Sequence, residues 1–386
     1  MKEYELNVTN PRTRIKNPVF GEKSGLFSDR GETIAYGYVH NIPFGKHAFI
    51  AKNDITDALS KVYRTPVMMK VYDTCGELTD IRTYKWGDDP AEGKPAKNTL
   101  IWDATQIQNI SAWNGLAPKV YSLDKVIFEG KTYPCQIVEE LPIKGNFWDG
   151  YGDEKYALHI YEQVKSLGEK YGFGVVEKED VNNRDAIGSK LVDFQTFNFK
   201  EPYEEFVRNS YIRDGKYGKV YYQNVPELGL SGGPRKSLER IETLALDRID
   251  FKDKSVLDIG CAGGFFCRYA LDQGAAYVRG VDMMQPIEAA RNLANHLGKF
   301  AIDYEVVDLD KGYDEEFDIV FFLSLIFHVD VPEAVKKAKV LVFEDNSKGN
   351  RHKKELGKPW TDWFSKIEHV GVATDHGDKS IYHLRK

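Results

Sequence analysis

A glycine-rich turn between an apolar strand and a helix is the segment best suited to chemistry. Residues 255–266 read Ser-Val-Leu-Asp-Ile-Gly-Cys-Ala-Gly-Gly-Phe-Phe, with Asp258 near the strand end. The glycines lack a Cβ, so the backbone there can approach a ligand closely. A second strand, 277–282, ends in Asp282, whose carboxylate can accept hydrogen bonds from both hydroxyls of a ribose. The pattern predicts a nucleoside site beyond the strand ends.

The charge of this turn favours a cationic ligand over a dinucleotide. A dehydrogenase turn, G-x-G-x-x-G, holds a pyrophosphate at a helix N-terminus. Here the run is Asp258-x-Gly260-x-Ala262-x-Gly264, and its carboxylate would repel a pyrophosphate. The same carboxylate suits an ammonium or a sulfonium, such as those of S-adenosylmethionine. We therefore expect these four residues to bind that cofactor.

The turn resembles the first motif of class I S-adenosylmethionine-dependent methyltransferases, with Ala262 where glycine is usual. Residues 278–282 resemble the second motif, which implies that Asp282 binds the ribose and that Met283 belongs to the same site. Residues 306–309 resemble the third strand end of that family. That likeness implies that Asp308 accepts from the adenine amino group and that the Leu309 backbone lies near the ring.

The resemblance extends to the rest of the C-terminal part and implies its fold. Residues 317–324, which include Leu323, resemble the fourth strand, the floor of the site. Strands are predicted at 339–344, 367–372 and 380–384, with helices at 287–297 and 332–337. Alternating strands and helices predict a Rossmann-like α/β domain. The expected sheet is mixed and seven-stranded, with its last strand antiparallel.

Candidate catalytic residues follow the fourth strand. Methyl transfer is an in-line displacement, so alignment supplies much of its rate. A base is needed only where the acceptor keeps its proton, and His328 titrates in a suitable range. We expect His328 and Ser324 to be catalytic, with Glu344 a second candidate; a histidine that only packs beside the strand is the alternative. The acceptor stays open between a small molecule, a glycan and RNA.

The upstream half carries a second, weaker pattern. Strand 66–72, helix 99–114, two strands within 125–139, helix 155–171 and strand 190–194 follow in order. This order resembles the protein-kinase-like fold, α+β in class. The resemblance implies a nucleotide and magnesium site made of residues that match the family only in part: Lys70, Asp103, Asp180, Asn183 and Asp193. ATP with magnesium is the cofactor this would imply.

The kinase-like pattern departs from the family at several positions. Asp103 stands where a glutamate is usual, and Gln195 stands where glycine should follow Asp193 and Phe194. The region 177–185 has no His-Arg-Asp sequence. Because phosphoryl transfer needs the base, the lysine and both metal ligands together, we expect the module to assist recognition rather than to phosphorylate.

Composition and turn-forming residues indicate where the domains begin and end. The proline- and glycine-rich stretch 224–234 predicts a connection between two modules. With the two resemblances, it implies a kinase-like domain over 1–223, a linker and lid helix over 224–253, and a methyltransferase domain over 254–386. A net charge of −6 argues against a broad basic surface that binds nucleic acid. The basic run 348–358 could still form a local nucleic-acid-binding patch, or it could be a solvated loop. No signal peptide or bilayer-spanning run is evident, so we expect a cytoplasmic protein of open oligomeric state.

Three hypotheses about function follow. The first is a methyltransferase whose upstream module recognises the substrate. The second is a bifunctional kinase and methyltransferase that phosphorylates and methylates a glycan terminus, by analogy with enzymes that cap bacterial polysaccharides. The third is a non-catalytic protein that binds S-adenosylmethionine.

Overall fold

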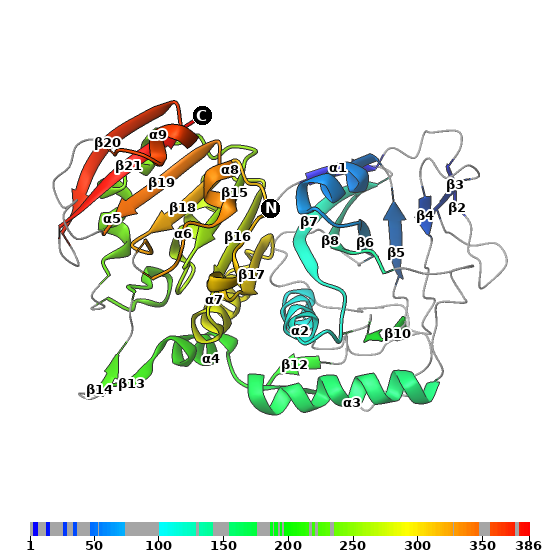
Figure 1. Cartoon of the computed structure of the whole chain (residues 1–386). Coiled ribbons are helices and arrows are strands. Elements are labelled where there is room, and N and C mark those ends of the chain that lie inside the picture. The colour runs from blue at the N-terminus through cyan, green and yellow to red at the C-terminus, as the bar shows by residue number, and fades with distance from the viewer. Residues whose placement is uncertain are drawn as a thin grey trace. The chain divides into compact units, whose positions relative to one another are not determined.

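The computed structural model of the chain divides into two units between Tyr203 and Glu204. Each unit is described by itself (Figure 1). The structure describes residues 3–6, 13–15, 26–28, 34–36, 47–52, 54–73, 100–128, 131–141, 154–175, 186–187, 189–191, 194, 197–215, 218–220, 223–231, 235–326, 328–346, 356–374 and 378–386.

The second unit is built on a seven-stranded sheet in the order β17-β16-β15-β18-β19-β21-β20. The strands are β15 (Ser255–Ile259), β16 (Tyr277–Asp282), β17 (Ile302–Val306), β18 (Ile319–Leu323), β19 (Val340–Asp345), β20 (Lys366–Ala373) and β21 (Lys379–Arg385). Neighbours from β17 to β19 pair in parallel, whereas β21 runs antiparallel to both β19 and β20. The predicted mixed sheet with an antiparallel last strand is confirmed.

Near-continuous apolar runs explain the central strands. Strands buried on both faces need no polar alternation, and β18 reads Ile-Val-Phe-Phe-Leu. Helices α6 (Phe265–Asp272) and α7 (Met284–His296) pack against the β15–β17 side, and α8 (Glu333–Lys337) packs against β18. The parallel strands all point the same way, so their carboxyl ends form one edge of the sheet.

The lid helix predicted within residues 224–253 is short in the structure. Helix α5 covers Ser237–Thr243, and a 3₁₀ turn, η4, covers Leu246–Arg248. Between them Ala245 adopts a φ of 48°, in the left-handed region. Because Leu244, Leu246 and Ile249 are all buried, the chain breaks its helical path to bring all three into the core. Helical spacing alone would leave one of them on another face.

The unit boundary also lies earlier than the expected one at 223/224. Helix α4 (Tyr203–Tyr211) ends in a tyrosine that bonds to the glycine turn, and Gln223 bonds to the same turn. These contacts place the chain between them with the second unit. A short hairpin, β13 (Arg213–Gly215) and β14 (Gly218–Val220), lies in that stretch.

The first unit carries a six-stranded sheet in the order β1-β7-β8-β6-β5-β4. Its strands are β1 (Glu3–Leu6), β4 (Ile34–Tyr36), β5 (His47–Lys52), β6 (Val67–Asp73), β7 (Val120–Phe128) and β8 (Lys131–Glu139). Its helices are α1 (Asp54–Tyr63), α2 (Ile101–Trp113) and α3 (Glu154–Tyr171). The elements predicted from 66 to 171 are therefore present, in the predicted order.

Short two-stranded pairs complete the first unit. They are β2 (Thr13–Ile15) with β3 (Leu26–Ser28), β9 (Phe173–Val175) with β12 (Phe197–Phe199), and β10 (Ala186–Ile187) with β11 (Lys190–Leu191). Within the part of the chain that the structure describes, no helix combines the length and apolar character needed to cross a bilayer.

Gly280 on β16 provides a test of how tightly the second unit is packed. A Cβ there would lie 2.8 Å from Cys267 Sγ and 2.9 Å from both Cys261 Sγ and Tyr304 Cδ1. We expect Gly280→Ala to lower the free energy of unfolding by about 1–3 kcal/mol, as over-packing of a core does. Hydrogen exchange of the β15–β18 amides measures this unit alone.

Gly357→Ala is the matched control, since a Cβ at Gly357 meets nothing within 4 Å. Equal protection of the β15–β18 amides in the wild type and in Gly280→Ala would contradict the packing described.

Candidate functional site

A cavity of about 760 Å³ opens at the carboxyl ends of the parallel strands of the second unit. It spans the region from β16 and β17 across β15 to β18 and the start of β21. The lining residues are Ser210, Tyr211, Gln223, Arg235, Gly260, Ala262, Gly263, Asp282, Met283, Pro286, Ala289, Val307, Asp308, Leu309, Asp310, Leu323, Ser324, Leu325, His328, Val329, Asn346 and Lys379. A ligand site at this edge is what a parallel α/β sheet predicts.

The glycine turn takes an unusual backbone path at the middle of the cavity. Gly260 and Gly264 both have φ values of 73°, and Ala262 has a φ of 48°. The alanine pays a steric cost of about 1 kcal/mol in this left-handed region. Asp282 holds it there, because one carboxylate oxygen accepts from the Ala262 amide at 2.7 Å and the other accepts from the Met283 amide at 2.7 Å.

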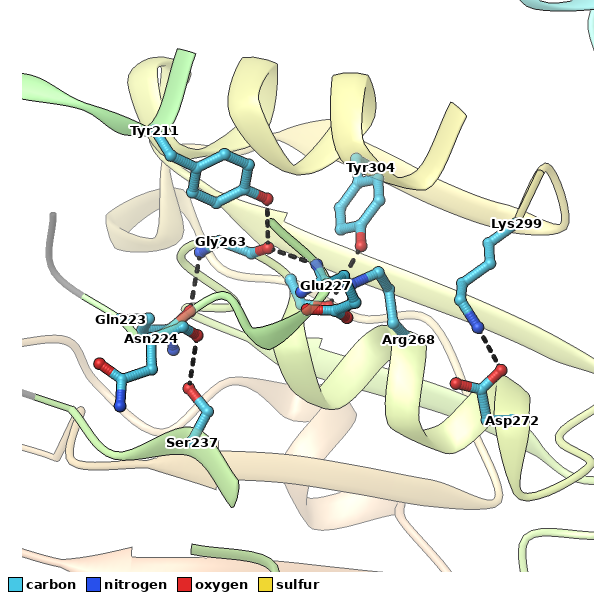
Figure 2. Close-up of polar contacts among 11 residues, drawn as sticks. Tyr211, Gln223, Asn224, Glu227, Ser237, Gly263, Arg268, Asp272, Lys299 and Tyr304 are labelled. Carbon is cyan, nitrogen blue, oxygen red and sulfur yellow. Dashed lines mark hydrogen bonds and ion pairs between the residues drawn. The ribbon is translucent and has the colours of Figure 1, made fainter. Parts of the chain in front are cut away.

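A second group of contacts fixes the turn at Gly263 (Figure 2). The hydroxyl of Tyr211 and the guanidinium of Arg268 both donate to the Gly263 carbonyl, at 2.8 and 2.7 Å. The Gly263 amide donates to Gln223 Oε1 at 3.1 Å. A Cβ at Gly263 would lie 2.8 Å from Tyr211, so the close approach requires glycine. Two residues from upstream of the sheet, Tyr211 and Gln223, thus hold the turn together with Arg268 of α6.

Arg268 links the turn to the segment before α5. Its side chain is buried, and its Nε donates to Glu227 Oε1 at 2.8 Å. Burial by itself would raise the pKa of the Glu227 carboxyl, but Arg268 holds that pKa below its ordinary value. The paired charges let an arginine lie under the turn without an uncompensated charge. Figure 2 shows Glu227 and Arg268 close together beside Gly263, with the Tyr304 hydroxyl pointing toward them.

Asp258 does not face the cavity as we expected. It is only 2% exposed, it is absent from the cavity lining, and it accepts from Cys267 Sγ at 3.5 Å. Burial raises the pKa of its carboxyl to about 7. Gly264 also lies outside the lining and starts α6, with the Tyr304 hydroxyl above it. The role of Asp258 opposite a ligand cation therefore has no support in this geometry.

The other predicted cofactor residues lie around the cavity. Seven of them line it: Gly260, Ala262, Asp282, Met283, Asp308, Leu309 and Leu323. Asp308 starts the 3₁₀ turn η5 (Leu309–Lys311), and its side chain accepts from the Asp310 amide at 3.3 Å. Acidic groups on adjacent strand ends, beside an open turn, fit a nucleoside with a ribose diol and an exocyclic amine.

The far end of the cavity is built around Ser324. Its hydroxyl donates to Glu344 Oε2 at 2.6 Å and accepts from Lys379 Nζ at 2.9 Å. Glu344 is fully buried and forms a two-pronged ion pair with Arg240, at 2.7 and 3.3 Å. Burial would raise the pKa of the Glu344 carboxyl, but Arg240, Ser324 and Lys379 hold it below its ordinary value.

Both residues predicted to be catalytic line this end of the cavity, in different surroundings. His328 is exposed at the cavity, whereas the Ser324 proton is committed to Glu344. Ser324 has a φ of 62°, and the Asn346 side chain donates to its carbonyl at 2.9 Å. A strained residue held by several bonds is typical of ligand clamps. Glu344 is an ion-pair partner rather than an open base.

Of the predicted nucleotide residues in the first unit, two are described. Lys70 lies on β6, directly opposite Gln136 of β8, and Gln136 bonds to Thr105 of α2 at 2.6 Å. Burial raises the pKa of the Asp103 carboxyl on α2 to about 6. Asp180, Asn183 and Asp193 lie outside the described residues.

Sequence reasoning missed four polar residues of the cavity or named them without a site. Tyr211 and Gln223 come from the stretch assigned to the first domain, and Lys379 starts the last strand. Arg235 lies two residues before the start of α5. No local motif marks these positions, because each reaches the cavity through pairing of distant segments. The predicted antiparallel strand at the C-terminus is the one sequence signal for any of them, and it concerns Lys379.

The strand order and the ligand edge together define the Rossmann-like fold of S-adenosylmethionine-dependent methyltransferases. Residues 257–342 match the family described as "Methyltransferase domain". The second unit therefore contains a methyltransferase domain, as the sequence predicted.

Curated relatives match the same region. A ubiquinone biosynthesis O-methyltransferase of Neisseria meningitidis serogroup C is 37% identical over 114 residues, which are 28% of this chain and 48% of that protein. The corresponding Pasteurella multocida protein is 30% identical over 109 residues, 25% of this chain and 44% of its own. The chain thus spans about half the length of the curated relatives it matches.

Solved structures are similar over part of the chain. The bifunctional kinase-methyltransferase WbdD is 20% identical with a TM-score of 0.34, over 43% of each chain. Magnesium protoporphyrin IX methyltransferase from Synechocystis PCC 6803 is 20% identical with a TM-score of 0.31, over 39% of this chain and 78% of that one.

The raised pKa of Asp258 predicts a pH dependence of stability. The ordinary pKa is 3.8 and the folded one about 7, so between these values the folded protein keeps a proton that the unfolded chain releases. Stability must fall as pH rises through that window, by at most about 1.4 kcal/mol per pH unit from this group. Asp258→Asn should show a shallower fall between pH 5 and 7.5, measured by hydrogen exchange of β15.

The exposed Asp247→Asn serves as the control and should keep the wild-type slope. The same slope in Asp258→Asn as in the wild type would rule out a protonated carboxyl at this position.

Proposed function

We propose that this protein transfers a methyl group from S-adenosylmethionine to an acceptor nucleophile. The observation that carries the proposal is the cavity at the strand ends within the methyltransferase domain, with Asp282 joining the glycine turn to the end of β16. The first unit is proposed to assist recognition of the acceptor, which can be a small molecule, a glycan or RNA.

The proposed roles follow from position in the cavity. Asp282 would bind the ribose hydroxyls, Asp308 the adenine amino group, and the turn around Gly260 the amino-acid end of the cofactor. The cofactor supplies an electrophilic methyl group on a sulfonium when bound. The protein then has to align the acceptor and exclude water, which accounts for much of the rate of a displacement.

Ser324 and His328 are proposed to act on the acceptor side. The hydroxyl proton of Ser324 points to Glu344, so the serine orients a ligand rather than removing a proton. His328 is exposed at the cavity and is the candidate base for an acceptor that keeps its proton at neutral pH. An acceptor already ionised would make that histidine dispensable.

Calorimetry with S-adenosylhomocysteine tests the cofactor assignment. Asp282→Ala removes the acceptor of two backbone amides and the proposed ribose ligand, so we expect affinity to fall at least about tenfold, about 1.4 kcal/mol. Asp282→Asn keeps one acceptor oxygen, so its affinity for S-adenosylhomocysteine should lie between those of the wild type and of Asp282→Ala.

Asp272→Ala is the matched control, since Asp272 lies on α6 and pairs with Lys299 on the surface (Figure 2). No binding by the wild type would refute the proposed function. Binding without turnover on any nucleophile would favour a non-catalytic S-adenosylmethionine-binding protein.

A kinase-like fold is our proposal for the first unit. It is supported by the order of β6, α2, β7, β8 and α3 along the chain, and by the place of Lys70 at the centre of the sheet. Lys70 pairs across the sheet with Gln136, which bonds to α2, so the lysine shares the face that the helix covers. That face is where a lysine would meet nucleotide phosphates in the family it resembles.

Nucleotide binding by the first unit is measured by thermal shift. If the module binds ATP with Mg²⁺, saturating nucleotide should raise Tm by about 2–5 °C, and Lys70→Ala should abolish the shift. Lys61→Ala, an exposed lysine on α1, is the control. A wild-type protein unaffected by ATP and Mg²⁺ would remove the bifunctional alternative and leave a recognition role.

A further inference from the structure

A glutamine from outside the matched methyltransferase region reaches the glycine turn. Gln223 precedes residues 257–342 and lines the cavity, and its Oε1 accepts from the Gly263 amide at 3.1 Å (Figure 2). A backbone amide can only donate, so this contact fixes which end of the side-chain amide is the oxygen. The Nε2 end, which carries two N–H donors, is therefore left for another partner.

The two donors at that end are available to a ligand. Among the residues that the structure describes, none accepts a hydrogen bond from Gln223 Nε2, and this nitrogen is not one of the buried polar atoms that lack a partner. Water therefore reaches it. Because Gln223 lines the cavity, an acceptor oxygen of a bound molecule can take the place of that water.

The neighbouring backbone holds the glutamine in this place. Gln223 forms an isolated parallel bridge with Arg235, and the Asn224 amide donates to the Arg235 carbonyl at 3.0 Å. The hydroxyl of Ser237, the first residue of α5, donates to the Asn224 carbonyl at 3.1 Å. These bonds join the chain before α5 to the start of that helix. A donor on a fixed backbone loses little conformational freedom when it binds a ligand.

The carbonyl of the turn is already occupied, which limits what this part of the wall can offer a ligand. Tyr211 and Arg268 both donate to the Gly263 carbonyl, at 2.8 and 2.7 Å. A carbonyl oxygen has two lone pairs, so this one has no capacity left for an ammonium group. Beside Gly263 the wall instead presents the N–H donors of Gln223, and donors of this kind suit a carboxylate.

We propose that Gln223 binds the carboxylate at the amino-acid end of the cofactor through Nε2, while its Oε1 holds the Gly263 amide. This inference rests on the proposed function, which assigns the glycine turn to that end of S-adenosylmethionine. One side chain then joins the ligand to the turn. The site thus prefers a nucleoside that carries the carboxylate over one that lacks it.

Calorimetry on the full chain with three nucleosides tests this assignment. S-adenosylhomocysteine carries a carboxylate and an ammonium, its decarboxylated analogue keeps only the ammonium, and methylthioadenosine has neither. Gln223→Glu keeps an acceptor for the Gly263 amide but replaces both donors by an oxygen. We expect it to bind S-adenosylhomocysteine at least about tenfold more weakly than the wild type does, and methylthioadenosine equally within about twofold. The decarboxylated analogue should bind to it at least as tightly as to the wild type.

Gln223→Met is a second variant, which removes both ends of the amide and keeps the length of the side chain. The ratio of the affinity for S-adenosylhomocysteine to that for the decarboxylated analogue cancels any change in the shape of the turn. This ratio should fall at least about tenfold in both variants. Gln273→Glu makes the same change of charge at an exposed residue after α6, outside the cavity lining, and should bind all three nucleosides as the wild type does.

Three outcomes separate the inference from its foundation. An unchanged ratio in the Gln223 variants would overturn the inference and leave the proposed function standing, because the glutamine would then act only on the turn. Tighter binding of S-adenosylhomocysteine by Gln223→Glu would also overturn it, since the ammonium would then lie at this side chain. If the wild type does not bind S-adenosylhomocysteine, the proposed function fails, and the inference fails with it.

Discussion

The hydrogen bonds that fix the glycine turn are the constraint on which the second unit depends. The turn places left-handed backbone at Ala262, which an alanine adopts only at a cost. Asp282 at the end of β16 stabilises this backbone by accepting from the Ala262 amide, and Gly263 is bonded to Tyr211, Gln223 and Arg268. Loss of either set would free the turn, and with it the shape of the cavity. The segment before α5 is therefore part of the ligand site, although it lies outside the sheet.

Ion pairs also hold backbone in place at the other end of the cavity. A buried pair adds little net stability over apolar packing, but removal of one partner strands a charge. Arg240 with Glu344 is such a pair, whereas the buried Arg268 pairs with Glu227, which is exposed; both arginines lie next to backbone that faces the cavity. Their main effect is to fix the positions of Ser324 and Gly263, because they supply only a small part of the folding free energy. Such pairs explain why arginines from α5 and α6 approach the strand ends at all.

The sequence predicted most of the second unit because its strands are long apolar runs bounded by glycine and acidic residues. Asp282, Asp308 and Ser324 lie along one edge of the sheet, as parallel strands that end together require. It misplaced Asp258, because a strand residue near a turn can point to either face, and only packing against Cys267 decides the face. It extended α5 too far, since helical spacing cannot reveal that Leu244, Leu246 and Ile249 need three directions at once. Lys379 reaches Ser324 only through the pairing of β21 beside β19, which no local pattern encodes.

The two ends of the cavity are lined by charged residues of opposite sign. Carboxylates gather where the strand order runs outward from β15 to β17, and cations gather where it runs outward from β18 to β21. Because Leu325 lies against Gly260, the two sides meet at the glycine turn itself. The turn therefore lies between the acidic and the basic parts of the cavity wall, and the bonds that hold it fix the distance between them.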